Sequence, residues 1–182
     1  IYKLTGELEG NRIDFLNMIN EPFNISLSNI QKLDHITCKN NRVFIFENPA
    51  VFQSIIQDTD IDESIICTSG QLNLSSYMLL NKIKNLDKIY YAGDFDPEGL
   101  QIADKLKDLY KDKVEFMLYD EKYYEKIISD KELDLKRISK LKSIKDNDLK
   151  YICDSLRKYK KAAYQELLID EYKQYIRQQV KG

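Results

Sequence analysis

Features that mark secreted, membrane-spanning and zinc-binding proteins are scarce in this sequence. The 182 residues include three cysteines and one histidine. Cys38, Cys67 and Cys153 lie far apart and form no C-x-x-C pair, which argues against a disulfide framework or zinc site and predicts reduced, buried thiols in a cytoplasmic protein. No run of about 18 apolar residues occurs and no basic-plus-apolar leader opens the chain, so we expect no membrane association. We assign the single histidine, His35, no function.

The chain also has almost no net charge, −2, but its charges are unevenly distributed. Residues 136–161 contain ten Lys and Arg against three Asp, a local excess of +7 that leaves −9 for the rest. This asymmetry suits a protein that gathers carboxylates at one place and faces phosphates at another. A solvated, lysine-rich surface is the alternative explanation.

At 43% hydrophobic residues, the chain is long enough for one well-filled core. It begins with isoleucine, and residues 4–12 resemble the interior of a polypeptide, so we expect a C-terminal piece of a longer protein. Residues 1–40 are weakly patterned, with helices expected near 12–19 and at 28–33, the second capped by Ser26 or Ser28. We interpret residues 1–40 as an N-terminal connecting segment and 41–182 as one domain.

From residue 42 onwards, short apolar runs alternate with helical periodicity. Strands are expected at 43–46, 64–68, 88–92 and 114–118, and helices are expected to begin near Pro49, Leu74 (running on to Leu86) and Pro97. This alternation predicts an α/β fold, a Rossmann-type parallel sheet of about four strands flanked by helices. Two further helices, at 146–160 and 162–180, are expected to form a helical C-terminal extension. The second carries an apolar stripe that we expect to be core: Tyr164, Leu167, Leu168, Tyr172, Tyr175 and Ile176.

Three acids stand where expected strands end, which is where reactive groups collect in a parallel α/β sheet. Glu47 closes the first strand, and Asp94 and Asp96 follow the third. Buried carboxylates brought together are unfavourable unless a cation neutralises them, and a hard divalent ion with oxygen ligands does so. We therefore expect these three side chains to bind Mg²⁺ or Mn²⁺.

The local sequence around Asp94 and Asp96 strengthens this expectation. Residues two apart at a strand end point the same way, so both carboxylates could reach one cation or bracket two. Gly93 and Gly99 leave room for close backbone approach, and Pro97 begins a helix whose N-terminus favours negative charge. Asp-x-Asp alone is common in solvated turns; its combination with the earlier strand and Glu-Asn-Pro is more specific.

The arrangement of Glu47 with Asp94-Phe95-Asp96-Pro97-Glu98-Gly99 resembles the Toprim domain, especially the version in topoisomerase VI A subunits and meiotic double-strand-break proteins. Three segments are more similar still to DUF2399, a C-terminal domain of JetD-type proteins, the nuclease subunits of Wadjet plasmid-defence systems. They are Phe46-Glu47-Asn48-Pro49-Ala50, Cys67-Thr68-Ser69-Gly70-Gln71 and Gly93-Asp94-Phe95-Asp96. The resemblance covers about residues 43–119, with a weaker similarity at Ala163-Tyr164-Gln165-Glu166.

The resemblance implies a Mg²⁺-dependent DNA endonuclease with Glu47, Asp94 and Asp96 as catalytic metal ligands. The metals would polarise the scissile phosphate and help to generate hydroxide. Glu98 is a candidate second-metal ligand or an exposed acid at a helix start, and Glu47 could instead act as general base. No tyrosine lies in a winged-helix context, which favours hydrolysis over transesterification. The expected partners are DNA, SMC-like, kleisin-like and accessory subunits, and a second copy in a homodimer.

Candidate DNA-binding residues lie in two places. Ser69, Gly70 and Gln71 end the middle strand, where their amides and hydroxyls could position a phosphate or simply form a capped turn. In the basic stretch, we expect Arg157, Lys160 and Lys161 to contact the DNA backbone.

Other functions stay open at this point. One is a non-catalytic Toprim-like module that binds metal or DNA within the same complex. Another is an Asp-x-Asp phosphatase, although such enzymes place a threonine two residues after the second aspartate, where this chain has Glu98. Toprim use in priming or RNA processing is a third.

Overall fold

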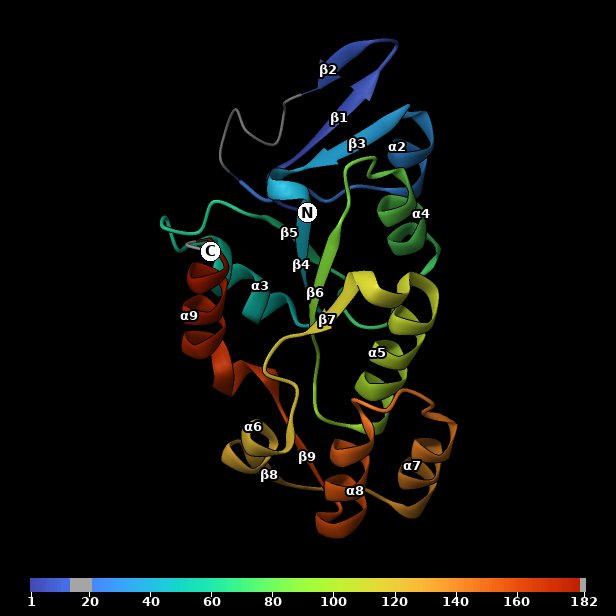
Figure 1. The fold of residues 1–182 in the computed structure, drawn as a ribbon, viewed down its shortest axis with the longest axis vertical. Coiled ribbons are helices and arrows are strands. Elements are labelled where there is room, and N and C mark those ends of the chain that lie inside the picture. The colour runs from blue at the N-terminus through green and yellow to red at the C-terminus, as the bar shows by residue number, and fades with distance from the viewer. Residues whose placement is uncertain (14–20, 181–182) are drawn as a thin grey trace. The chain divides into compact units, whose positions relative to one another are not determined.

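The short apolar runs form a four-stranded parallel sheet in the order β5-β4-β6-β7 (Figure 1). Its strands are β4 (Arg42–Phe46), β5 (Ser64–Cys67), β6 (Lys88–Ala92) and β7 (Val114–Phe116). Residues 43–46 of β4 are fully buried, as expected for a strand with both faces covered. The α/β class and the four predicted strands are therefore confirmed.

This computed structural model describes residues 1–13 and 21–180 of the chain. The chain divides into two compact units, Ile1–Tyr90 and Tyr91–Gly182. The division that the sequence suggested, at residue 40, stays a prediction about domains.

In the first unit, the N-terminal residues form a small antiparallel sheet, β2-β1-β3, that the sequence pattern did not indicate. Its strands are β1 (Leu4–Leu8), β2 (Asn11–Ile13) and β3 (His35–Cys38). The predicted helix near 12–19 falls almost wholly outside the described residues, and its first two positions, 12 and 13, are strand. The predicted helix at 28–33 is confirmed as α2 (Leu27–Lys32), which Ser26 caps through a reciprocal pair of hydrogen bonds with Asn29.

The two helices that follow α2 in the first unit are capped by asparagines. Asn48 caps α3 (Pro49–Ile56), which begins at proline as predicted. Asn73 caps α4 (Leu74–Lys82), which ends before the predicted Leu86 because Ile83 turns to an extended conformation and bridges to β3. The short 3-10 helix η1 (Lys39–Asn41) links β3 to β4.

The second unit contains β7 packed against the long helix α5 (Pro97–Tyr110), followed by elements that the sequence analysis left unassigned (Figure 1). These elements are η2 (Lys111–Lys113), α6 (Glu121–Lys126), β8 (Ile128–Glu132), α7 (Leu135–Ser139) and η3 (Lys140–Ser143). The chain ends in α8 (Lys150–Tyr159), β9 (Lys161–Ala163), η4 (Gln165–Leu168) and α9 (Ile169–Val180).

Two predictions about the C-terminal extension need correction. The helix expected from residue 162 begins only at Ile169, because residues 161–163 form β9 and pair with β8. The apolar stripe is confirmed at Leu168, Tyr172 and Ile176, which are fully buried, but Leu167 lies in η4 and is 61% exposed. The stripe is core, as expected, at these three positions, whereas Tyr164 and Tyr175 are partly exposed.

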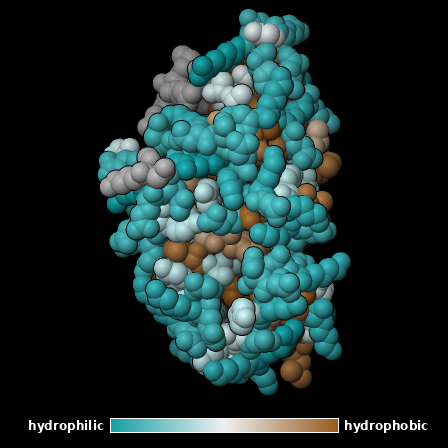
Figure 2. Space-filling view, in the orientation of Figure 1, coloured by the Kyte–Doolittle hydropathy of each residue, from teal (hydrophilic) through white to brown (hydrophobic). Residues whose placement is uncertain are grey.

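The visible surface is largely hydrophilic, and hydrophobic residues are scattered over it in small groups (Figure 2). None of the helices within the described residues is long and apolar enough to cross a membrane. All three cysteines are free, as predicted; Cys38 and Cys153 are buried and Cys67 is partly exposed.

Candidate functional site

The loop after β6 is fixed by the buried side chain at its centre, Phe95. Its backbone exchanges hydrogen bonds of 2.9 and 3.0 Å with Ala163 at the end of β9. Its ring lies 4.6 Å from the Tyr119 ring and 6.0 Å from the Tyr124 ring, centroid to centroid. Because Phe95 points into the core, the side chains of its neighbours Asp94 and Asp96 both point away from the Phe95 ring at the end of the strand.

The backbone of Asp94 is held from two further sides. The Tyr119 hydroxyl donates a 2.6 Å hydrogen bond to the Asp94 carbonyl oxygen. Gly99, in the first turn of α5, lies so close that a Cβ there would stand 2.2 Å from this same oxygen. Only glycine at position 99 allows the first turn of α5 to pack this closely against the backbone of the loop.

Replacing Tyr119 with phenylalanine is expected to lower the free energy of unfolding by about 1 kcal/mol, because a hydrogen bond to the loop is lost without a change of shape. Thermal unfolding should record a fall of roughly 2–4 °C. Tyr159→Phe is the control, since its hydroxyl donates to Glu125 at the surface. Equal shifts in the two variants would contradict a special role for Tyr119.

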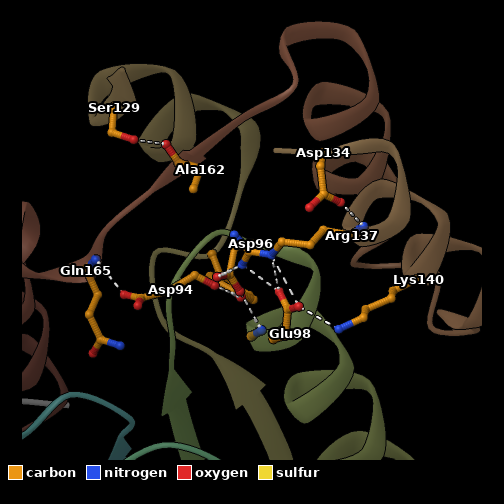
Figure 3. A network of polar contacts seen from close by, with 11 residues as sticks. Asp94, Asp96, Glu98, Ser129, Asp134, Arg137, Lys140, Ala162 and Gln165 are labelled. Carbon is orange, nitrogen blue, oxygen red and sulfur yellow. Dashed lines mark hydrogen bonds and ion pairs between the residues drawn. The ribbon is translucent and has the colours of Figure 1, made fainter. Parts of the chain in front are cut away.

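Asp96 serves as the N-cap of α5 and as an ion-pair partner. Its Oδ1 accepts a 2.8 Å hydrogen bond from the Gly99 amide, and its Oδ2 accepts a 2.5 Å bond from Nη2 of Arg137 on α7. The cap explains why α5 begins where it does. The carboxylate therefore faces α7 rather than Asp94, as Figure 3 shows.

Glu98 gathers positive charge at the same helix start (Figure 3). Arg137 Nε and Nη2 donate to its carboxylate at 3.0 and 2.6 Å, and Lys140 Nζ donates at 2.7 Å. Burial by itself would raise the pKa of Glu98, but the hydrogen bonds from the two cations prevail and lower it to about 2. Glu98 is therefore ionised, and two cations stand beside the Asp-x-Asp loop.

Asp94 has the opposite electrostatic surroundings. Its Oδ1 accepts a 3.1 Å hydrogen bond from the backbone N–H of Gln165, at the start of η4. Burial raises the pKa of Asp94 to about 6, and the negative charges of Glu166 and Asp96 add to the rise against the bonds from Gln165. The charges that raise the pKa of Asp94 are thus carboxylates, and their negative charge favours a cation at this position.

Gln165 itself is completely buried. Its side chain runs beside Asp94 (Figure 3) and is close enough to lower the pKa of that carboxyl. Nevertheless, neither its amide nitrogen nor its amide oxygen has a partner in hydrogen-bonding geometry among the described residues. Buried amides are nearly always satisfied, so an exception beside a carboxylate is notable.

The family comparison covers most of the chain. Residues 23–176 match the family model described as "Protein of unknown function C-terminus (DUF2399)". The chain belongs to the DUF2399 family. A comparison with curated proteins gave no match.

The structure brings together only some of the site residues predicted for this DUF2399 chain. Asp94, Asp96 and Glu98 share the loop and helix start after β6, where Arg137 pairs with Asp96 and Glu98 and Lys140 pairs with Glu98. Among residues 1–13 and 21–180, however, no three His, Cys, Asp or Glu side chains are gathered as a metal-ligand group. Glu47 follows β4 in the other unit and is partly exposed, and its part in a metal site stays a prediction.

The predicted DNA-binding residues are mostly engaged locally or exposed. Ser69 and Gly70 form a turn with positive φ angles of 51° and 101°, closed by a 2.8 Å bond from the Thr68 hydroxyl to the Gly70 carbonyl. Gln71 is exposed. In the second unit, Arg157 pairs with Asp154, Lys161 pairs with Asp130, and Lys160 is the left-handed C-cap of α8. DNA contact by these residues stays a prediction.

Three residues of the site were not predicted as such: Arg137, Lys140 and Gln165. Arg137 and Lys140 lie within the basic stretch, residues 136–161, that the sequence pattern indicates as a surface facing phosphates. Gln165 belongs to the short segment near the C-terminus, residues 163–166, that resembles the family. That similarity is the signal that could have found Gln165. Because a helix was expected from residue 162, the sequence analysis did not predict that this segment contacts Asp94.

The donor set fits a hard divalent cation. Asp94 is a buried carboxylate whose pKa is raised, and Gln165 offers an amide oxygen that lacks a partner among the described residues. Carboxylate and amide oxygens are the ligands that Mg²⁺ and Mn²⁺ accept. Asp94 is the carboxylate that would hold such an ion, whereas Asp96, whose two oxygens accept from Gly99 and Arg137, and Glu47 stay ligands predicted from the sequence.

Proposed function

We propose that this DUF2399 domain is a metal-dependent DNA endonuclease that hydrolyses phosphodiester bonds. The observation that carries the proposal is the pairing of opposite environments after β6: Asp94 lies among carboxylates, and Arg137 and Lys140 lie 2.5–2.7 Å from the neighbouring acids. One side of the loop attracts a cation, and the other supplies the charge that binds phosphate oxygens.

The residues have separate roles in this proposal. Asp94 and Asp96 hold Mg²⁺ or Mn²⁺ together with Glu47, and the ion, when bound, polarises the phosphate and lowers the pKa of water. The Arg137 guanidinium and the Lys140 ammonium, which pair with Asp96 and Glu98, supply positive charge beside the loop that attracts phosphate oxygens. The N-terminus of α5, opened by Pro97, favours the same negative charge.

We further propose that the substrate is plasmid DNA and that the domain acts as a JetD-type nuclease subunit. The support is the order of the three motifs that resemble the Wadjet proteins. SMC-like, kleisin-like and accessory subunits would then deliver the DNA, and a homodimer would cut both strands.

Removal of the metal is expected to abolish cleavage. The protein should nick or linearise closed circular plasmid with Mg²⁺ or Mn²⁺, and cleavage should stop when EDTA is added. Glu47→Gln should weaken cleavage, because a ligand charge is lost, and exposed Asp108→Asn on α5 serves as the matched control. Agarose gels report the products with and without the partner subunits.

A second function, a non-catalytic module that holds DNA or metal in the same complex, is favoured by one observation. The carboxylates of Asp96 and Glu98 are already neutralised by Arg137 and Lys140, as in a purely structural ion-pair network. If no cleavage occurs even with partner subunits added, this second function is the better account. If Glu47→Gln cuts as well as wild type, Glu47 is not a ligand of the catalytic metal.

A further inference from the structure

The segment that follows β9 brings a buried polar side chain to the Asp94 carboxylate. Ala163 is tied to Phe95 by two backbone hydrogen bonds, and two residues later the Gln165 amide N–H donates to Asp94 Oδ1. The contact joins residues 71 positions apart in the chain. The location of Gln165 is therefore determined by the same pairing that fixes the loop.

The side chain of Gln165 lies close enough to Asp94 to lower the pKa of that carboxyl, but it forms no well-aligned hydrogen bond there. It is 0% exposed, and its amide nitrogen and oxygen have no hydrogen-bonding partner among the described residues. A buried amide without a partner destabilises the folded chain, and a methionine or leucine of similar size would avoid that loss. A buried polar group that lowers the stability of the folded chain, and that lies beside a carboxylate, points to a ligand that both groups bind.

The charge around Asp94 indicates what kind of ligand that is. The groups whose charges act on it are Glu166 and Asp96, both negative. A phosphate or other anion is repelled there, whereas a divalent cation is attracted. The amide oxygen of glutamine is a neutral ligand that such cations accept, and it adds no further negative charge to the cluster.

We infer that Gln165 is a cation ligand of the proposed metal site, where its side-chain amide oxygen binds the divalent ion that Asp94 holds. The inference rests on the proposed function for the presence of the ion. It adds a residue from a distant part of the chain and a neutral oxygen to the carboxylates.

The test measures Mn²⁺ binding to the protein in the absence of DNA. Isothermal titration calorimetry compares wild type, Gln165→Met, Gln165→Glu and the surface control Gln174→Met, which is exposed on α9. We expect Gln165→Met to weaken binding about 10-fold or more, since even an indirect partner of a metal contributes about that much. Gln165→Glu keeps a ligand oxygen and should retain most of the affinity, and the control should bind like wild type.

Thermal unfolding in EDTA provides the second measurement. Gln165→Met should have a melting temperature equal to or above that of wild type, because the variant removes a buried polar group without a partner. With Mn²⁺ added, the order should reverse, since the variant gains less stability from the ion. A structural amide predicts the opposite result in EDTA, a lower melting temperature for Gln165→Met, and that result overturns the inference.

The outcomes separate the two proposals. Wild type that binds Mn²⁺ while Gln165→Met binds it equally well overturns the inference and leaves the proposed function standing. Wild type that binds no divalent cation overturns both. Loss of affinity in Gln165→Met with retention in Gln165→Glu supports both.

Discussion

Gly99→Ala is expected to lower the free energy of unfolding by about 3 kcal/mol, the upper part of the range for overpacking substitutions. The added methyl carbon would stand 2.2 Å from the Asp94 carbonyl oxygen and 3.1 Å from its carbon. These atoms belong to backbone, and Tyr119 and the paired Phe95 hold that backbone in place. The clash cannot be relieved by rotating a side chain, so either α5 or the loop must move. The melting temperature, measured by thermal unfolding, should fall by roughly 6–12 °C.

Gly6→Ala is the matched control for this substitution. A Cβ at position 6 would stand 3.0 Å from a methyl carbon at the end of the Leu33 side chain, which can turn away. Gly6→Ala should therefore lower the free energy of unfolding much less than Gly99→Ala does. Because Gly99→Ala displaces Asp94, the variant should also lose the proposed cleavage. Similar melting temperatures for Gly99→Ala and wild type would show that the loop yields easily.

The central α/β elements could be predicted from sequence because their signals are local. The run Val43–Phe46 is apolar on both faces, as a buried parallel strand requires, and Asn48 with Pro49 is a sufficient helix start. The antiparallel strands β1 and β3 could not be found this way. They are half-buried, and β1 is paired with residues about 30 positions away, where Leu4 faces Cys38.

The start of the last helix was misplaced for a related reason. Residues 161–163, Lys-Ala-Ala, have a high intrinsic helix preference, but Ala163 pairs with Ile128 of β8 and with Phe95. Tertiary pairing thus overrides local preference. The same pairing brings Gln165 to Asp94, so the error about the helix and the omission of Gln165 have one cause.

The acids of the site were predictable, but their partners were not. Asp94, Asp96 and Glu98 follow a strand and begin a helix within five residues, so general rules of α/β folds locate them. Arg137 reaches Asp96 across 41 residues, and its element, α7, is only five residues long. Nothing in a short helix on a basic stretch indicates which acid it will pair with.

Asp94→Asn is expected to reduce the proposed cleavage at least about 100-fold while stabilising the metal-free protein at neutral pH. Loss of an outer-shell partner already costs metal sites about 10–100-fold, and Asp94 is proposed as a direct ligand. Asparagine keeps the shape and the oxygen that accepts from the Gln165 N–H. It removes a negative charge that burial and the charges of Glu166 and Asp96 disfavour.

The raised pKa of Asp94 determines the pH range in which Asp94→Asn is more stable than wild type. The pKa of Asp94 rises from its ordinary value of 3.8 to about 6 in the folded chain. The folded state therefore binds the proton more tightly than the unfolded state. Stability from this group is complete below about pH 3.8 and is lost as the pH rises through 6. In EDTA, the variant and wild type should melt alike near pH 4, and the variant should become the more stable as the pH rises to 7.

Asp108→Asn is the control for both measurements, because Asp108 is an exposed carboxylate paired with Lys111 on the same surface. It should leave cleavage unchanged and should not gain stability with rising pH. A difference in melting temperature between Asp94→Asn and wild type that is independent of pH would mean that the surroundings of Asp94 do not raise the pKa of its carboxyl. A carboxylate that weakens the folded chain at neutral pH, yet whose loss abolishes cleavage, would be retained for its charge rather than for its contribution to the fold.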